Sequence, residues 1–182
     1  MPIAGKTGYS PTQILLHWVI AALVLFQLVF GDSIGHVLRA AKRGRAVSAA
    51  DVTLGTLHYW VGLVILALVA VRIAVRFSSG APAPVATNGP AWLAEAARFS
   101  HGLFYVLLVA TPILGLLGYY FGDPFGDIHS LAKPVFIILI SVHAAAALFH
   151  QFWLRDGTLA RMILPARRRA EATREFAREP GR

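Results

Sequence analysis

The chain has 182 residues, of which 57% are hydrophobic and only 14% charged, and its mean hydropathy is +0.62. Because soluble domains carry about 25% charged residues, the composition argues against a water-soluble globule and against a disordered chain. The absence of cysteine excludes disulfides, iron–sulfur clusters, thiolate metal sites and c-type heme attachment. The net charge of +8 is typical of basic loops in a membrane protein, so we expect no nucleic acid partner.

Four long apolar stretches follow one another, at about residues 14–30, 54–77, 99–121 and 131–154. Each is long enough to cross a bilayer, which takes roughly 17–25 mostly apolar residues, and each is apolar on all sides. We expect the first stretch to be a retained helix, because no small-residue cleavage site follows it. Pro112 in the third is tolerable inside a bundle. The sequence therefore predicts an all-α, integral membrane four-helix bundle.

The connections between these stretches are expected to be irregular. Residues 32–53 are polar and basic and predict a loop, and residues 78–98 are rich in Pro, Gly and Ala, with a short helical turn at 91–98. Residues 122–130 contain the Asp, Pro and Gly of a short turn. The tail from residue 155 is basic and polar, and we expect it to be partly helical or disordered.

The distribution of Lys and Arg predicts the orientation. With the N-terminus inside, 12 Lys and Arg lie inside and 5 outside, although the first loop places four of those cations outside. The positive-inside rule therefore favours both termini in the cytoplasm.

Histidines within the apolar stretches carry the chemistry. Six of the seven lie in or at the ends of the spans, where ionisable residues are costly and are usually functional; they are His17, His58, His101, His129, His143 and His150. A neutral imidazole is a good ligand for heme iron. No carboxylate lies within the spans to complete a non-heme metal site or a proton relay.

The depth of each histidine predicts which of them pair. His58 and His129 begin spans at the outer side, and they are the two candidates at that depth. His143 follows His129 by 14 residues, which is about 21 Å along a helix and about 40° short of four turns, so both rings point to one face. One helix thus offers two ligands at two depths.

Four histidines compete at the inner depth, and we pair His17 with His143 because these two lie deeper than His101 and His150. His150 is the main rival, since it follows His143 by seven residues on nearly the same face. The prediction is two bis-imidazole hemes with irons about 20 Å apart.

Several charged residues could have either of two roles. Arg72 and Arg76 could pair with heme propionates or serve as cytoplasmic anchors in the headgroup region. Lys133 and the basic residues 39–45 could steer an anion to the outer heme, or could simply be solvated.

These residues also form a set of motifs: His17-Trp18, His58 with Gly62, Val71-Arg72 with Arg76, His101 with Pro112 and Gly115, His129, the run Ser141-Val142-His143 through His150, Trp153, and Asp156-Gly157-Thr158-Leu159. The set resembles the prokaryotic cytochrome b561 family, and more distantly the cytochrome b subunits of nickel–iron hydrogenases and formate dehydrogenases. The resemblance covers residues 10–165 as one four-helix transmembrane domain, and the basic tail of residues 166–182 lies outside it.

The resemblance implies a diheme b-type cytochrome of the bacterial inner membrane, a multi-pass protein in contact with membrane lipid and the respiratory chain. It implies that His17, His58, His129 and His143 ligate the iron of two heme b groups, and that electrons are exchanged with ubiquinone. Small members of the family include a superoxide:ubiquinone oxidoreductase, in which an outer basic funnel guides superoxide. Here the first loop and Lys133 would form that funnel.

Two other functions remain open at this point. The chain could be the membrane cytochrome b subunit of a dehydrogenase or hydrogenase complex, with a redox partner protein. It could also be a His-lined metal transporter, although the absence of intramembrane Asp, Glu and Cys argues against this.

Overall fold

The computed structural model describes residues 8–80, 82, 90, 92–122 and 124–165, and within these residues every regular element is helical. The elements are α1 (Pro11–Phe30), α2 (Asp32–Lys42), α3 (Ala49–Ser79), α4 (Trp92–Phe121), α5 (Phe125–Phe149), a π-helical turn η1 (His150–Leu154) and a 3-10 turn η2 (Leu159–Met162). Four helices are long and apolar enough to cross a membrane, namely α1, α3, α4 and α5 continued to Leu154. The four predicted spans are thereby confirmed.

Local sequence signals set the ends of α1 and α3. Ser10 caps α1 in a capping box with Gln13, in which each side chain bonds to the other's backbone N–H, at 3.3 and 3.0 Å. Ser48 caps α3 through the N–H of Asp51 at 3.0 Å. Gly80 then ends α3 with a φ of 69°, which only glycine adopts without strain.

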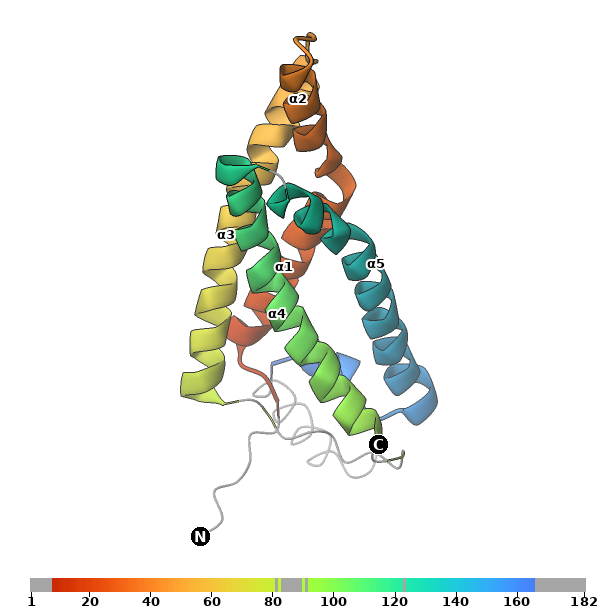
Figure 1. Cartoon of the computed structure of the whole chain (residues 1–182). Helices are drawn as coiled ribbons and strands as arrows, with labels where there is room; N and C mark the ends of the chain where they lie inside the picture. The colour runs from red at the N-terminus through yellow and green to blue at the C-terminus, as the bar shows by residue number, and fades with distance from the viewer. Residues whose placement is uncertain (1–7, 81, 83–89, 91, 123, 166–182) are drawn as a thin grey trace, which may run out of the picture.

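The long helices run alternately up and down (Figure 1). The start of α1, the end of α3, the start of α4 and the end of α5 lie together at one end of the molecule, which we call the inner end. The α2–α3 hairpin lies at the opposite, outer end. Contacts join α1 to α3, α3 to α4, and α4 to α5.

The protein core is thin. Its buried cluster comprises Ile20 and Val24 of α1, Ile65 and Val69 of α3, and Phe136 of α5. Among the described residues only Val69 is a large side chain that is fully buried, and α4 has no buried residue at all. Large apolar side chains instead face outward along every long helix, as expected where lipid replaces water.

The expectation of a loop at residues 32–53 is wrong for much of that segment. Residues Asp32–Lys42 form α2, which packs on the first half of α3 (Figure 1). Asp32 in its first turn and Arg39 and Lys42 in its last turn have the charges that favour a helix dipole. With 11 residues of mixed polarity, α2 lacks the long apolar signal that identifies the four spans.

Two other expected boundaries also move. Helix α4 begins at Trp92, so the predicted short turn at residues 91–98 is the start of a long continuous helix, and α5 begins at Phe125 instead of residue 131. Pro112 lies inside α4 without ending it, as predicted. The expectation of a partly helical or disordered tail covers residues 155–182: its described part contains the 3-10 turn η2, and residues 166–182 lie outside the described residues.

Candidate functional site

Two histidines meet at the outer side of the bundle. His58 of α3 and His129 of α5 have ring centroids 5.8 Å apart, with the rings nearly perpendicular at 85°. We call this pair the outer histidine layer. The Nδ1 of His129 donates a hydrogen bond to the carbonyl oxygen of Thr111 at 2.9 Å. Because a carbonyl can only accept, this bond leaves Nε2 of His129 as the nitrogen available to a metal.

Helix α4 allows the close approach of His129 through Gly115. A Cβ at that position would stand 3.0 Å from two atoms of the imidazole, so a larger residue would displace the ring. At the end of α1, a Cβ on Gly31 would stand 3.1 Å from Nδ1 of His58. The two rings of the outer histidine layer therefore depend on glycines of two other helices.

Gln27 supports His58 and was not identified from the sequence. Its side-chain Nε2 donates to the carbonyl oxygen of His58 at 2.8 Å, which ties α1 to α3. Both Oε1 of Gln27 and Nδ1 of His58 are buried without a hydrogen-bond partner among the described residues. Gln27 and His17 are the two strongly polar residues of the apolar stretch 14–30, and the cost of a polar side chain there is the signal that could have indicated this role.

Three histidines meet nearer the inner end. His143 of α5 lies with its ring centroid 6.4 Å from that of His17 on α1 and 5.5 Å from that of His101 on α4. We call these three residues the inner histidine layer. His17 and His143 are half-buried, whereas His101 is exposed. The structure thus brings the predicted partners together and adds His101 beside them.

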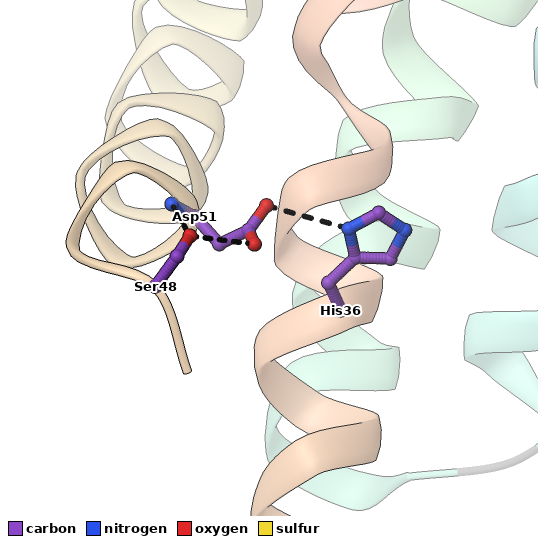
Figure 2. A network of polar contacts seen from close by, with 3 residues as sticks. All are labelled: His36, Ser48 and Asp51. Carbon is purple, nitrogen blue, oxygen red and sulfur yellow. Dashed lines mark hydrogen bonds and ion pairs between the residues drawn. The ribbon is translucent and has the colours of Figure 1, made fainter. Parts of the chain in front are cut away.

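His150 and His36 lie apart from these layers, each paired with a carboxylate. Nδ1 of His150 lies 2.5 Å from Oδ2 of Asp156 at the inner end, and Nδ1 of His36 lies 3.3 Å from Oδ1 of Asp51 in the α2–α3 hairpin (Figure 2). In the part of the chain that the structure describes, no group of three or more His, Asp or Glu side chains could hold a metal ion.

Basic residues predicted to contact the cofactor have protein partners. Arg72 is half-buried and donates through Nε to the hydroxyl of Tyr105 at 3.3 Å, and the guanidinium of Arg76 lies 5.8 Å from the centroid of the same ring. At the outer side, Nζ of Lys133 donates to Oδ2 of Asp32 at 2.6 Å. This hydrogen bond holds the pKa of Asp32 below its usual range.

The donor set fits heme. When two imidazoles ligate one metal ion from opposite sides, each nitrogen lies about 2 Å from the metal, so the ring centroids stand roughly 6 Å apart. The separations of 5.8 Å for His58 and His129 and 6.4 Å for His17 and His143 match this requirement. Imidazole is a common axial ligand of heme iron.

The chain combines apolar membrane-spanning helices with paired imidazoles that face one another between the helices. This combination is typical of the helical membrane cytochromes. Within that class, the family model described as prokaryotic cytochrome b561 matches residues 8–165. The chain belongs to the prokaryotic cytochrome b561 family. It is accordingly a multi-pass membrane cytochrome that binds heme b and serves in electron transport.

Three curated relatives illustrate the range of the family. Cytochrome b562 of Cereibacter sphaeroides is 39% identical over 161 residues, which cover 88% of this chain and 98% of that protein. Cytochrome b561 homolog 1 of Escherichia coli K12 is 28% identical, covering 85% of this chain and 96% of that protein. The probable superoxide oxidase CybB of Yersinia pestis is also 28% identical, covering 85% and 95%.

Proposed function

We propose that this cytochrome holds two b-type hemes and moves electrons between the two sides of the membrane. In this proposal His58 and His129 ligate the outer heme, and His17 and His143 ligate the inner heme. One observation carries it: α5 presents His129 and His143 at two depths, and each ring meets an imidazole from a different helix at a separation that suits one iron. We assign the inner ligand role to His17 and not to His101 because His17 lies deeper in its apolar stretch.

The protein's contribution is to hold and orient the ligands. Fourteen residues of α5 place the two layers about 21 Å apart, so the hemes would lie one above the other. The heme iron, when bound, supplies one-electron chemistry that no side chain of this cysteine-free chain offers. The hydrogen bond from His129 to Thr111 fixes the tautomer of that ligand, as outer-shell partners of metal-bound histidines do.

Two basic residues near the inner histidine layer could help to hold the heme, and the distribution of basic residues indicates how the chain is oriented in the membrane. Arg72 and Arg76 lie beside the inner layer, where their guanidinium groups could pair with heme propionates in place of Tyr105. Because an N-terminus-inside orientation puts 12 Lys and Arg of the sequence inside and 5 outside, we propose that both termini lie in the cytoplasm and that the α2–α3 hairpin lies outside a bacterial inner membrane.

For the reaction, we propose superoxide as donor and ubiquinone as acceptor. The Yersinia relative is a probable superoxide oxidase, and the basic residues Arg39, Arg43 and Arg45 lie on the outer hairpin, where they would attract an anion. Each superoxide would release one electron and become O₂, and two electrons with two protons would reduce ubiquinone to ubiquinol. Lys133 contributes less than expected because it is paired with Asp32.

A second candidate is the membrane subunit of a dehydrogenase or hydrogenase complex. The histidine motifs also resemble, more distantly, those of the cytochrome b subunits of nickel–iron hydrogenases, which favours keeping this candidate. Purification of the tagged chain in mild detergent from its own host distinguishes the two, because a dedicated subunit would bring a soluble redox partner with it.

The first test is a pyridine hemochrome assay on detergent-purified protein. Two heme b per chain would support the two-layer assignment, and one would show that one layer is misassigned. No heme, in protein expressed with ample heme, would overturn the proposal and return attention to a His-lined metal transporter.

A further inference from the structure

The end of α5 departs from regular helix in a way that partly buries a His–Asp pair. After Phe149 the helix widens into the π-helical turn His150–Leu154, and Arg155 follows with a left-handed φ of 51°. Both features are uncommon and cluster at functional sites, because each is strained and needs its surroundings to hold it. Together they bring Asp156 back onto His150.

The pair is short and nearly closed to solvent. Nδ1 of His150 lies 2.5 Å from Oδ2 of Asp156, and the side chains are 17% and 4% exposed. Oδ1 of Asp156 accepts a hydrogen bond from the backbone N–H of Thr158 at 2.9 Å. Burial raises the pKa of the Asp156 carboxyl, but the hydrogen bonds from His150 and Thr158 outweigh it and hold that pKa below its usual range.

The ionised carboxylate fixes the protonation pattern of His150. Since a carboxylate can only accept, Nδ1 of His150 carries the proton of their hydrogen bond. Nε2 is then the ring nitrogen left free to accept a further proton. The pair can therefore hold one extra proton without creating an unpaired buried charge.

The pair also lies close to the inner histidine layer. His150 follows His143 by seven residues, which is about 10 Å along the axis and about 20° short of two turns. The segment after it is tied to α1, because Nε1 of Trp18 donates to the carbonyl oxygen of Met162 at 2.7 Å. The ring of Trp18 in turn contacts that of His17, with centroids 5.3 Å apart.

We propose that His150 and Asp156 form a proton-binding site coupled to reduction of the inner heme. This inference rests on the proposed ligation of an inner heme by His17 and His143. Each electron that reaches the inner iron, from the outer heme or another one-electron donor, would be accompanied by uptake of one proton at Nε2 of His150 from the inner aqueous side. The added negative charge would attract the proton, because His150 lies about two helical turns beyond the proposed ligand His143.

Other charged groups near the proposed inner heme could also make its potential depend on pH, so their effects must be distinguished from that of the His150–Asp156 pair. His101 on α4 is titratable and contacts His143, and Arg72 and Arg76 on α3 face the same layer. Arg155 and Arg161 lie on the segment that carries Asp156. Arginine stays protonated at all relevant pH values, so His101 is the competing protein group.

The experiment is an optical redox titration of the purified two-heme protein at several pH values between about 6 and 8, where histidine titrates. The midpoint potential of the inner heme should fall as pH rises, by up to about 59 mV per pH unit for one proton per electron, while that of the outer heme stays level. Asp156→Asn and His150→Gln should each reduce the dependence of the inner-heme midpoint potential on pH. His101→Gln should retain it.

The exposed His36–Asp51 pair supplies a matched control (Figure 2). Its nitrogen and oxygen lie 3.3 Å apart with side chains 55% and 29% exposed, and it lies at the opposite end of the molecule, so Asp51→Asn should leave both slopes unchanged. A slope that persists in both inner variants and disappears in His101→Gln would overturn the inference.

A second measurement needs no variant. Reduction of the wild-type protein in weak buffer with a pH-indicator dye should show net proton uptake, and its absence would also overturn the inference. The proposed function fails separately, because a missing heme is seen in the absorption spectrum before any titration begins.

Discussion

The outer and inner histidine layers are built differently, although α5 contributes one ring to each. The outer layer has two histidines, one of which, His129, is oriented by Thr111 and held close to α4 by Gly115. The inner layer has three histidines in contact and a partly buried His–Asp pair two turns beyond. The comparison suggests that the outer layer is shaped to hold a cofactor, and the inner layer to hold one and also to exchange protons.

The largest effect should come from removing a ring of the outer layer. His58→Ala or His129→Ala should leave one heme per chain, because an iron that loses one of two imidazoles is held weakly in a membrane interior. The pyridine hemochrome assay measures this, with His36→Ala as the control that keeps two. Retention of both hemes in either outer variant would refute the outer pairing.

Comparing variants of His17 and His101 tests which of these two histidines ligates the inner heme together with His143. His17→Ala should lose the inner heme, since the half-buried His17 ring is at the spacing that one iron needs. His101→Ala should keep two hemes and shift the inner potential only. The opposite result, with heme lost from His101→Ala and kept in His17→Ala, would reassign the inner ligands to His101 and His143.

A smaller effect should follow from filling the space beside His129. Gly115→Val would place side-chain atoms within about 3 Å of the ring, so the outer heme should show a shifted potential and reduced occupancy while the inner heme is unaffected. Redox titration and heme content measure this. Gly102→Ala is the control on the same helix, because nothing lies within 4 Å of a Cβ there. Equal behaviour of the two variants would show that Gly115 is not needed for close approach.

The smallest effect concerns Asp32 and Lys133, which join α2 to α5 near the outer layer. Because the pKa of Asp32 is lowered in the folded protein, its contribution is present above the unfolded pKa and is lost as pH falls through the folded value. Lys133→Gln should lower stability at neutral pH by less than about 1 kcal/mol, since the pair is exposed. Thermal unfolding at pH 7 and at acid pH measures this, and the difference from wild type should shrink in acid.

The spans were predictable because their signal is long and local. Twenty or more apolar residues identify α1, α3, α4 and α5 without reference to neighbours. Helix α2 has only 11 residues and mixed polarity, and its packing on α3 depends on contacts that are distant in sequence. The sequence therefore predicted the membrane part of the fold and missed the hairpin outside it.

The histidine pairs were predictable to the extent that depth and helical phase decide them. His58 and His129 had no rival at their depth, and the structure places them together. At the inner depth the same argument left four candidates, because it cannot tell which rings turn toward one another. The contact of His101 with His143, and the withdrawal of His150 to Asp156, depend on the rotation of α4 and on the π turn, which no local pattern signalled.

The thin protein core has a consequence for how the cytochrome is made. With α4 burying no residue and Val69 the one large side chain fully enclosed among those described, the helices have little with which to recognise one another in lipid. Two flat heme groups, each ligated by histidines of two helices under the proposed assignment, would add the contacts that hold the helices together. Biogenesis and cofactor insertion then become one event, and heme supply in the cell would set how much of the chain escapes quality-control proteolysis.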